Sequence, residues 1–154
     1  MIKITPPRGD EHGYLVKLRN DNRDLFFDNR KITLKSHLEW YNNLTANDFF
    51  FIIKFRDGTP LGTISLYNIT NKTGEYGRFV IEEKYRGNGY GKRAMRLLMA
   101  FAESCGLNYI YGDIFGFNVS AINLDIDLGF KYIKSFLDRY GNIIVRMGYD
   151  LLAS

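Results

Sequence analysis

The segment most able to do chemistry is a glycine-rich run with basic ends: Arg86, Gly87, Asn88, Gly89, Tyr90, Gly91 and Lys92. An apolar run typical of a strand precedes it, and an amphipathic pattern typical of a helix begins at about Tyr90. Glycines allow positive φ angles and a close approach of a ligand to the backbone. The first turn of a helix presents unbonded N–H groups and the positive end of its dipole. The segment therefore predicts a cradle for a diphosphate, with charge-assisted bonds from Arg86 and Lys92.

Other interpretations of this segment are a flexible loop, a dinucleotide fingerprint and a phosphate loop. The fingerprint requires Gly-x-Gly-x-x-Gly after the first strand of a parallel unit, whereas Gly87, Gly89 and Gly91 alternate after the fourth predicted strand. A phosphate loop requires a hydroxyl residue after Gly-Lys, and here Arg93 stands in that place. Neither motif therefore fits this segment, and a flexible loop remains an alternative interpretation.

Two blocks of the chain together resemble the GNAT N-acetyltransferase superfamily. The first is Arg-x-x-Gly-x-Gly, carried by Arg86, Gly89 and Gly91 between a strand and a helix. The second follows about 30 residues later and matches the family pattern at Asn118, Ala121, Leu124, Gly129 and Phe130. The resemblance covers most of the chain. It implies an acetyl-CoA-dependent enzyme with a mostly antiparallel sheet, a splayed parallel strand pair and flanking helices.

The resemblance also implies how acetyl-CoA is held as a cosubstrate. The strand before the turn, Phe79, Val80 and Ile81, is expected to hydrogen-bond the pantetheine arm through its backbone. The N–H groups of residues 87–92 are expected to hold the pyrophosphate. Asn118 is expected to contact the pantetheine, to cap its helix, or both.

Acetyl transfer to an amine requires a base, an oxyanion donor and an acid for the thiolate. Glu75 lies where similar enzymes carry a glutamate base, although a solvent-facing residue at a strand end fits the sequence equally well. His37 is a second candidate base, because an imidazole titrates near neutrality, and a capping role is its alternative. The backbone N–H of Ile81 is the expected oxyanion donor.

The acid is unassigned, because Asp125 stands where the family usually has a tyrosine. An aspartate with an ordinary pKa of about 3.9 is ionised at neutral pH and is a poor donor. Tyr132, Tyr111 or water are the alternatives, and a thiolate is also a tolerable leaving group without an acid.

The N-terminal third resembles that of bacterial N-acetyltransferases that act on nucleotide-linked amino sugars. Arg19, Arg30 and Lys31 are expected to meet a nucleotide diphosphate, and Trp40 or His37 is expected to pack on a base or a sugar. Core packing on its helix is the favoured alternative for Trp40. Two other hypotheses remain: an enzyme for protein N-termini, as in relatives that modify ribosomal proteins, and a coenzyme A sensor without turnover.

Hydrophobic periodicity predicts the elements that position these residues. We expect an irregular lead-in at residues 6–9, a strand at 14–18, a short helix through 25–27 and a helix capped by Thr33. Leu34, Leu38, Trp40, Tyr41 and Leu44 are expected to point from that helix into the core. The remaining predictions are strands at 49–55, 61–67 and 75–81, a helix at 90–105, a strand at 107–112, a helix from 118 to 128, and strands at 130–133 and 143–147. In the helix at 90–105, we expect Ala94, Leu97, Leu98, Phe101 and Cys105 to face the core. This order predicts an α/β (α+β) mixed sheet.

Composition sets the broad class of the protein. The 154 residues, 45% apolar and 25% charged, predict one globular domain spanning residues 1–154. The net charge is +4 and the densest basic cluster brackets the glycine turn, which favours a local anion site over nucleic acid. One cysteine and two histidines predict no metal site. No apolar stretch is long enough for a membrane span, so we expect a cytoplasmic enzyme with a small-molecule amine substrate. The sequence leaves open whether the protein forms a homodimer.

Overall fold

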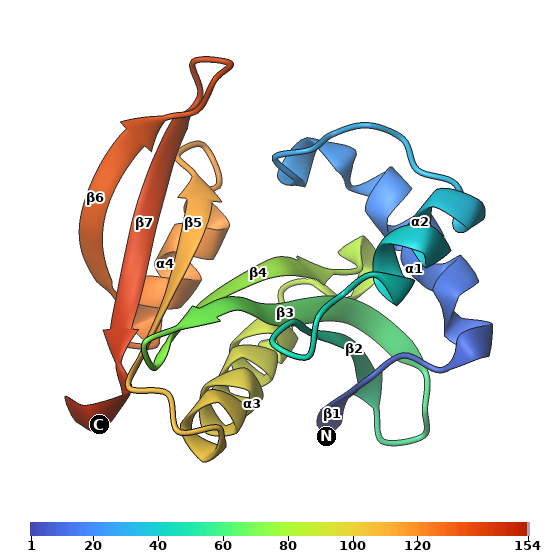
Figure 1. Cartoon of the computed structure of the whole chain (residues 1–154), viewed down its shortest axis with the longest axis horizontal. Coiled ribbons are helices and arrows are strands. Elements are labelled where there is room, and N and C mark those ends of the chain that lie inside the picture. The colour runs from blue at the N-terminus through green and yellow to red at the C-terminus, as the bar shows by residue number, and fades with distance from the viewer. Residues whose placement is uncertain (154) are drawn as a thin grey trace.

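The computed structural model describes residues 1–153 and contains one seven-stranded sheet with helices on both faces (Figure 1). The strands are β1 (Ile2–Thr5), β2 (Phe49–Phe55), β3 (Pro60–Thr70), β4 (Thr73–Ile81), β5 (Tyr109–Phe115), β6 (Lys131–Leu137) and β7 (Ile143–Asp150). The α-helices are α1 (His12–Asp21), α2 (Leu34–Asn42), α3 (Tyr90–Ser104) and α4 (Val119–Asp127). Helices α1 and α2 cover one face of the sheet, and α3 runs along the other. The predicted mixed sheet is confirmed.

The sheet has one break in its pairing, between β4 and β5. Its order is β1-β2-β3-β4-β5-β7-β6, and only β4 and β5 are parallel, since α3 crosses over between them. Their register runs from Thr73 opposite Tyr109 to Tyr76 opposite Gly112 and then stops, although both strands continue. The two strands therefore diverge, and Figure 1 shows β5, β6 and β7 as a wall that leans away from β4.

A β-bulge bends β4 at the same place. Thr63 of β3 pairs with Val80 and Ser65 pairs with Gly77, so β4 holds one residue more than β3 over this interval. Arg78 lies in the bulge with a φ of 47°. Such an extra residue bends its strand and increases the local twist. The bulge therefore turns the end of β4 away from β5.

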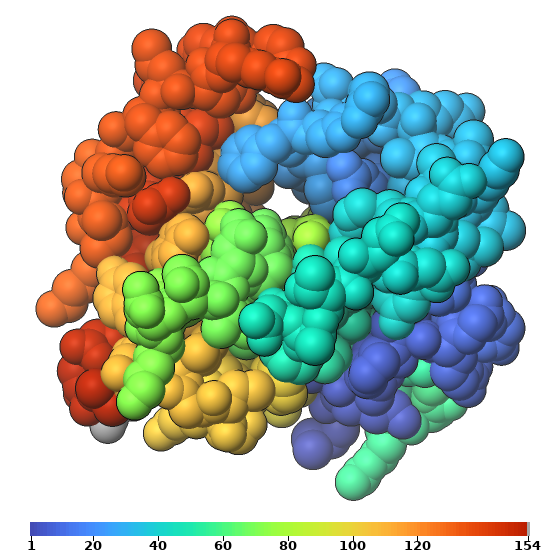
Figure 2. Space-filling model, in the orientation of Figure 1, coloured from blue at the N-terminus to red at the C-terminus, as the bar shows by residue number. Residues whose placement is uncertain are grey.

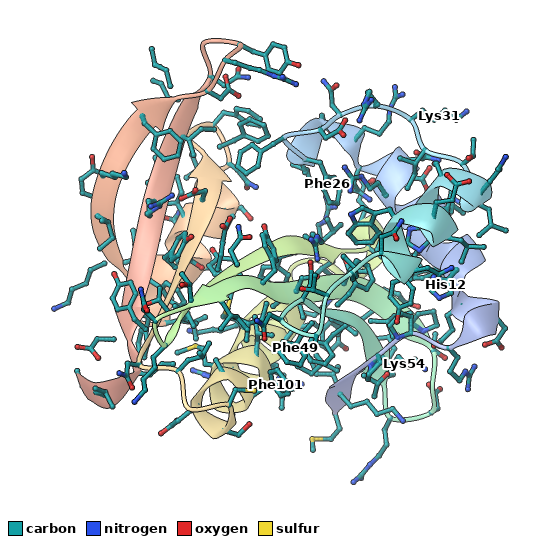
Figure 3. All side chains as sticks on the ribbon, in the orientation of Figure 1. His12, Phe26, Lys31, Phe49, Lys54 and Phe101 are labelled. Atoms are coloured by element: carbon teal, nitrogen blue, oxygen red, sulfur yellow. The ribbon has the colours of Figure 1, made fainter. Side chains whose placement is uncertain are left out.

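The main apolar core lies between the sheet and α3. Ala94, Met95, Leu98 and Ala102 form the buried stripe of this helix. The predicted stripe was partly wrong, because Leu97 is 37% exposed and Cys105 is exposed. Leu97 lies to one side of this stripe, and Cys105 follows the last residue of the helix as its C-cap. Phe101 does pack as expected, with its ring 4.9 Å from that of Phe49 on β2 (Figure 3).

The N-terminal region departs from the prediction. The predicted strand at 14–18 is part of α1, and no prediction covered β1, which pairs with β2 from Ile2 opposite Phe55. The irregular lead-in expected at residues 6–9 follows β1 and is confirmed up to the 3-10 turn that begins at Gly9. Leu15 and Leu18 are both buried at helical spacing, a pattern that five residues also allow for a strand. In α2, the capping role of Thr33 is confirmed, because its side chain accepts from the N–H of Ser36. Leu34 is 48% exposed, and the buried residue of α2 is His37 instead.

A buried ion pair joins the N-terminal region to the sheet. Lys54 of β2 lies 2.5 Å from a carboxylate oxygen of Glu11, which ends the short 3-10 turn Gly9–Glu11. Both side chains are less than 10% exposed. Among residues 1–153, no helix is long and apolar enough to span a bilayer, and no cluster of acidic, histidine or cysteine residues is suited to a metal.

Candidate active site

The glycine turn connects β4 to α3 in an open conformation. Gly87 and Gly89 both have a φ of 80°, and Gly89 is the N-cap of α3. Within the described residues, no backbone N–H from Gly87 to Lys92 donates a hydrogen bond to a protein acceptor. These N–H groups lie at the positive end of a 15-residue helix dipole. The N–H groups on which the predicted diphosphate cradle depends are therefore unbonded and lie at the start of a helix.

The basic residues of the turn differ in their contacts. The guanidinium of Arg86 donates to the carbonyl of Ile81 at 2.8 Å and to the side chain of Asn22 at 2.7 Å. Arg86 therefore connects the turn to the end of β4 and to Asn22, the C-cap of α1. Its sequence context does not reveal this role. The side chain of Asn88 bonds back to the carbonyls of Tyr85 and Arg86.

A surface cleft, the turn cleft, runs from the glycine turn toward the start of α4. Its wall includes every residue predicted to hold acetyl-CoA except Asn88: Phe79, Val80, Ile81, Arg86, Gly87, Gly89, Tyr90, Gly91, Lys92 and Asn118. Asn118 is also the N-cap of α4, because its side-chain oxygen accepts from the N–H of Ala121 at 3.3 Å. Both roles expected of Asn118 are therefore compatible with its position.

A cavity of about 230 Å³ fills the space between the diverging strands, and we call it the strand gap. Its wall includes the end of β4 from Gly77 to Val80, the end of β5 at Ile114 and Phe115, and α4. Phe79, Val80, Asn118 and Ala121 line both the turn cleft and the strand gap. The two spaces are therefore neighbours, and together they lead from the glycine turn into the divergence of the sheet.

Asp125 of α4 lies on the wall of the strand gap and is 1% exposed. Its Oδ2 accepts a hydrogen bond from the hydroxyl of Tyr76, whereas its Oδ1 is buried without a partner. Burial raises the pKa of Asp125 to about 7, against a smaller lowering by the Tyr76 hydrogen bond. The expectation of an ordinary ionised carboxylate was wrong, because it took no account of burial.

The two tyrosines considered as alternative acids lie elsewhere. Tyr132 is 62% exposed on the edge strand β6 and contacts Ser135. Tyr111 of β5 donates to Glu75 at 3.3 Å. Neither hydroxyl lies on the wall of the strand gap.

Glu75 of β4 lines a third space, the hairpin cavity, between residues 27–30 and the loop that joins β6 to β7. Its carboxylate accepts hydrogen bonds from the hydroxyls of Tyr67 and Tyr111 and, at 2.9 Å, from the amide of Asn68. Asp113 lies on the same wall and is paired with Arg146 at 2.7 and 2.9 Å. Figure 2 shows an opening between the N-terminal segment and the β6–β7 hairpin. Within this cavity, Glu75 is therefore a carboxylate held by neutral donors.

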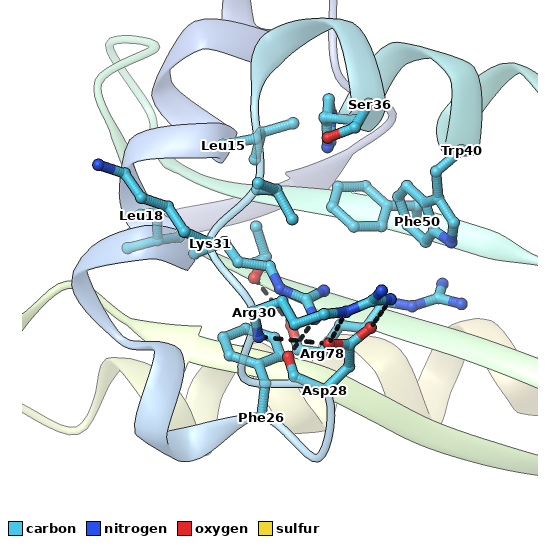
Figure 4. Close-up of a pocket in the computed structure, with 14 residues that line it drawn as sticks. Leu15, Leu18, Phe26, Asp28, Arg30, Lys31, Ser36, Trp40, Phe50 and Arg78 are labelled. Carbon is cyan, nitrogen blue, oxygen red and sulfur yellow. Dashed lines mark hydrogen bonds and ion pairs between the residues drawn. The ribbon is translucent and has the colours of Figure 1, made fainter.

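The N-terminal helices and the sheet enclose a cavity of about 480 Å³, the basic pocket (Figure 4). Its wall includes the predicted substrate residues Arg19, Arg30, Lys31 and Trp40, and also His37. The prediction that these residues form one group in space is supported by their common wall.

A fourth cation of the basic pocket, Arg78, was missed by sequence analysis. Its guanidinium pairs with Asp48 at 2.8 and 3.1 Å and lies 4.7 Å from the centre of the Trp40 ring. Nothing in the sequence marks Arg78, because it reaches the pocket from the β4 bulge.

The other cations of the pocket are held to different degrees. Arg30 forms a bidentate pair with Asp28, with distances of 2.9 and 2.7 Å. Arg19 donates to the carbonyl of Asp28 and stacks on Phe26, and its Nε is buried without a partner. Lys31 is exposed at the rim. The pocket therefore retains positive charge for a ligand.

His37 is 5% exposed and bonds through Nε2 to Nδ1 of His12 at 2.8 Å. Burial, and then repulsion by His12 and Arg19, lowers the pKa of His37 to about 4. His37 is therefore a weak base at neutral pH.

Comparisons with known proteins agree with this geometry. The model of the acetyltransferase (GNAT) family matches residues 15–130. No curated protein sequence matches the chain. Among solved structures, a spermidine N-acetyltransferase from Vibrio cholerae in complex with CoA and spermine has a TM-score of 0.88 at 16% identity, covering 98% of this chain and 96% of that one.

Two further solved structures are similar. An N-acetyltransferase from Staphylococcus aureus Mu50 has a TM-score of 0.84 at 16% identity, with 98% of this chain and 99% of that one covered. A ribosomal-protein-alanine N-acetyltransferase from Brucella melitensis has a TM-score of 0.83 at 16% identity, with 96% and 99% covered. The family model, the fold and the diphosphate cradle agree: the chain belongs to the GNAT acetyltransferase family and is an acetyl-CoA-dependent N-acetyltransferase.

Proposed function

We propose that the enzyme acetylates the primary amine of an anionic small molecule, with a nucleotide-linked amino sugar as the leading acceptor. The observation that carries this proposal is the composition of the basic pocket. Its wall holds four cationic side chains beside the rings of Phe26, Trp40 and Phe50. Arg30 is paired with Asp28 and Arg78 with Asp48, whereas Arg19 and Lys31 form no ion pair among the described residues. Phosphate oxygens bind to cations and a nucleobase stacks on aromatic rings. A polyamine would instead be repelled by these cations.

The arrangement of the cavities supports a direction for the acceptor. Arg19, Phe26, Asp28 and Arg78 line both the basic pocket and the strand gap. An acceptor with its anionic part in the basic pocket would therefore reach the strand gap with its other end. We place the amine there, close to the divergence of β4 and β5.

The turn cleft and the strand gap suit acetyl-CoA, which supplies an acetyl thioester with a carbonyl carbon open to attack by a neutral amine. The free N–H groups of residues 87–92 would bind its pyrophosphate, with Lys92 beside them. Beyond Tyr76, the edge of β4 has no strand partner on the β5 side. Backbone groups of Phe79, Val80 and Ile81 on that edge would therefore bind the pantetheine, and the N–H of Ile81 would hold the oxyanion.

Glu75 is the proposed general base. Its carboxylate lines the hairpin cavity, which shares Asp28 and Asp113 with the strand gap, and it is held by the neutral donors Tyr67, Asn68 and Tyr111. It would take the proton of the acceptor ammonium directly or through a water molecule. Asp113 is less suitable because Arg146 neutralises it. His37 lines the basic pocket, but it is 5% exposed and its ring is bonded to that of His12.

A peptide N-terminus is the second candidate acceptor, favoured by the hairpin cavity. Its wall holds four acidic side chains, Asp28, Glu75, Asp113 and Asp138, against two basic ones. A cationic peptide end could enter between residues 27–30 and the β6–β7 hairpin.

Thiol release from acetyl-CoA with a panel of amines tests these alternatives. The panel should contain nucleoside-diphosphate amino sugars, the free amino sugars, spermidine and short peptides. We expect the highest kcat/KM with the nucleotide-linked sugars. A preference for peptides or spermidine would refute the anionic acceptor, and coenzyme binding without turnover on any amine would support a sensor.

A matched pair of lysine variants tests the pocket itself. Lys31→Met removes a cation from the rim of the basic pocket, whereas Lys35→Met removes an exposed lysine of α2 outside that wall. One charge-assisted contact of about 1 kcal/mol corresponds to about a fivefold change in affinity. We expect KM for the nucleotide-linked sugar to rise about fivefold in the first variant and to stay unchanged in the second. Equal KM values in both variants would refute a phosphate site at Lys31.

A further inference from the structure

Tyr76 and Asp125 form a buried pair at the point where the parallel strands separate. Tyr76 is the last residue of β4 in register with β5, opposite Gly112. A Cβ on Gly112 would come within 2.1 Å of the Tyr76 ring, so the ring can lie across β5 only because residue 112 is glycine. The Tyr76 hydroxyl thereby reaches α4 and donates to Oδ2 of Asp125.

The other carboxyl oxygen of Asp125 is unpaired. Oδ1 is buried and has no hydrogen-bond partner, although Asp125 is on the wall of the strand gap. Within the described residues, no basic side chain forms an ion pair with Asp125, and Tyr76 is its single ionisable hydrogen-bond partner. The other titratable groups on the wall are Arg19, Asp28, Tyr67, Arg78 and Asp113.

The charge state of Asp125 follows from this environment. An ionised carboxylate that is buried without a cation is costly, so the group retains a proton instead. Because Oδ2 accepts from Tyr76, the proton of the neutral carboxyl is on Oδ1. The raised pKa of Asp125 agrees with this assignment.

Successive side chains of a strand point to opposite faces of its sheet. Glu75 therefore lies on one side of β4, with the hairpin cavity, and Tyr76 reaches toward α4 on the other. A thioester carbonyl between these two faces would have the base on the acceptor side and a neutral carboxyl on the coenzyme side. This order matches the two proton transfers that acetyl transfer requires.

We propose that Asp125 is the catalytic acid that protonates the coenzyme A sulfur, and that Tyr76 is the residue that positions it. The Oδ1 proton is transferred to sulfur as the carbon–sulfur bond breaks and its electron pair passes to the sulfur. Asp125 is left as a carboxylate that still accepts from Tyr76, and it regains a proton from water after product release. The proposal rests on acetyl transfer, but not on which amine is the acceptor.

Three variants test the proposal, with the best amine found for the wild type. Asp125→Asn keeps the size and a neutral donor but has no transferable proton. Tyr76→Phe removes the hydrogen bond to Oδ2. Asp57→Asn, in the turn between β2 and β3, is the control far from these cavities.

The expected kinetics separate an acid from a structural residue. Loss of a general acid typically costs about 10²-fold or more, so kcat of Asp125→Asn should fall by that factor, with KM for acetyl-CoA changed less than twofold. Wild-type kcat should fall as the pH rises through the pKa of Asp125, because the acid must be protonated. This decrease of kcat at alkaline pH should be absent in Asp125→Asn. It should lie at higher pH in Tyr76→Phe, because that variant lacks a hydrogen bond that stabilises the carboxylate.

A measurement without turnover provides the independent readout. Infrared difference spectroscopy of the wild type minus Asp125→Asn at pH 6, without coenzyme, should show the C=O band of a protonated carboxyl. The absence of this band would overturn the proposal, and so would a kcat within twofold of wild type in Asp125→Asn. A larger loss of coenzyme A affinity than of kcat would assign Asp125 to pantetheine binding instead. Failure of the nucleotide-sugar acceptor would appear only in the amine panel and would leave these results unchanged.

Discussion

Replacing Asp125 by asparagine should remove a large pH dependence from the stability of the enzyme. The carboxyl has a pKa of about 7 in the folded state and a reference value of 3.8. Between these two values, the unfolded chain has released the proton whereas the folded protein still holds it. Stability therefore falls as the pH rises through this window, and it is constant above and below it.

The size of the effect follows from the difference between the two pKa values. A separation of about three pH units at about 1.36 kcal/mol each gives about 4 kcal/mol. Asp125 is 1% exposed, so solvent screens little of this term. The asparagine variant has no such titration, because its amide is neutral at every pH and still offers an acceptor to Tyr76. Its free energy of unfolding should match that of the wild type near pH 4 and exceed it by about 4 kcal/mol near pH 8.

Urea unfolding between pH 4.5 and 8.5, followed by the fluorescence of Trp40, measures this difference directly. Asp57→Asn is the control, because a hydrogen bond from the N–H of Thr59 holds the pKa of Asp57 below its usual value and outside this window. A stability difference between Asp125→Asn and the wild type that stays constant over this range would refute a buried, protonated Asp125.

Four further substitutions have definite expected outcomes. Glu75→Gln should lower kcat about 10²- to 10⁴-fold in steady-state assays, with little change in KM for acetyl-CoA, and a loss below tenfold would remove Glu75 as the base. Gly89→Ala should lower the free energy of unfolding by about 1 kcal/mol or more, because its φ of 80° disfavours a side chain. Gly13→Ala, in α1 with open space around it, should raise that free energy by about 0.4–1 kcal/mol, and equal effects of the two glycine variants in thermal unfolding would contradict the reasoning. Lys54→Met should cost about 3 kcal/mol, because it removes the closest cation from the buried Glu11 carboxylate and leaves it with Arg8 alone, and an unchanged midpoint of urea unfolding would show that the pair is solvated.

Features of the chain that depend on neighbouring residues could be predicted from its sequence. The glycine turn, the helix after it and the cap at Thr33 were all placed correctly, because φ preferences and helix capping act within a few residues. The apolar runs of β2, β3 and β4 likewise predicted strands near their observed bounds. The prediction for the N-terminal region failed because β1 has only four residues and because five residues of α1 also suit a strand.

The chemistry of individual side chains depended on residues distant in the sequence. Asp125 keeps its proton up to about pH 7 because α4 buries it against Tyr76, which is 49 residues earlier, and His37 is a weak base because it is buried beside His12. Arg78 enters the basic pocket through a bulge that exists only in the pairing of β3 with β4. The sequence alone thus determined where the backbone N–H groups proposed to hold the diphosphate lie, since free N–H groups at a helix start are a local property. Only the tertiary structure decided which groups can exchange protons, because burial and partners set a pKa.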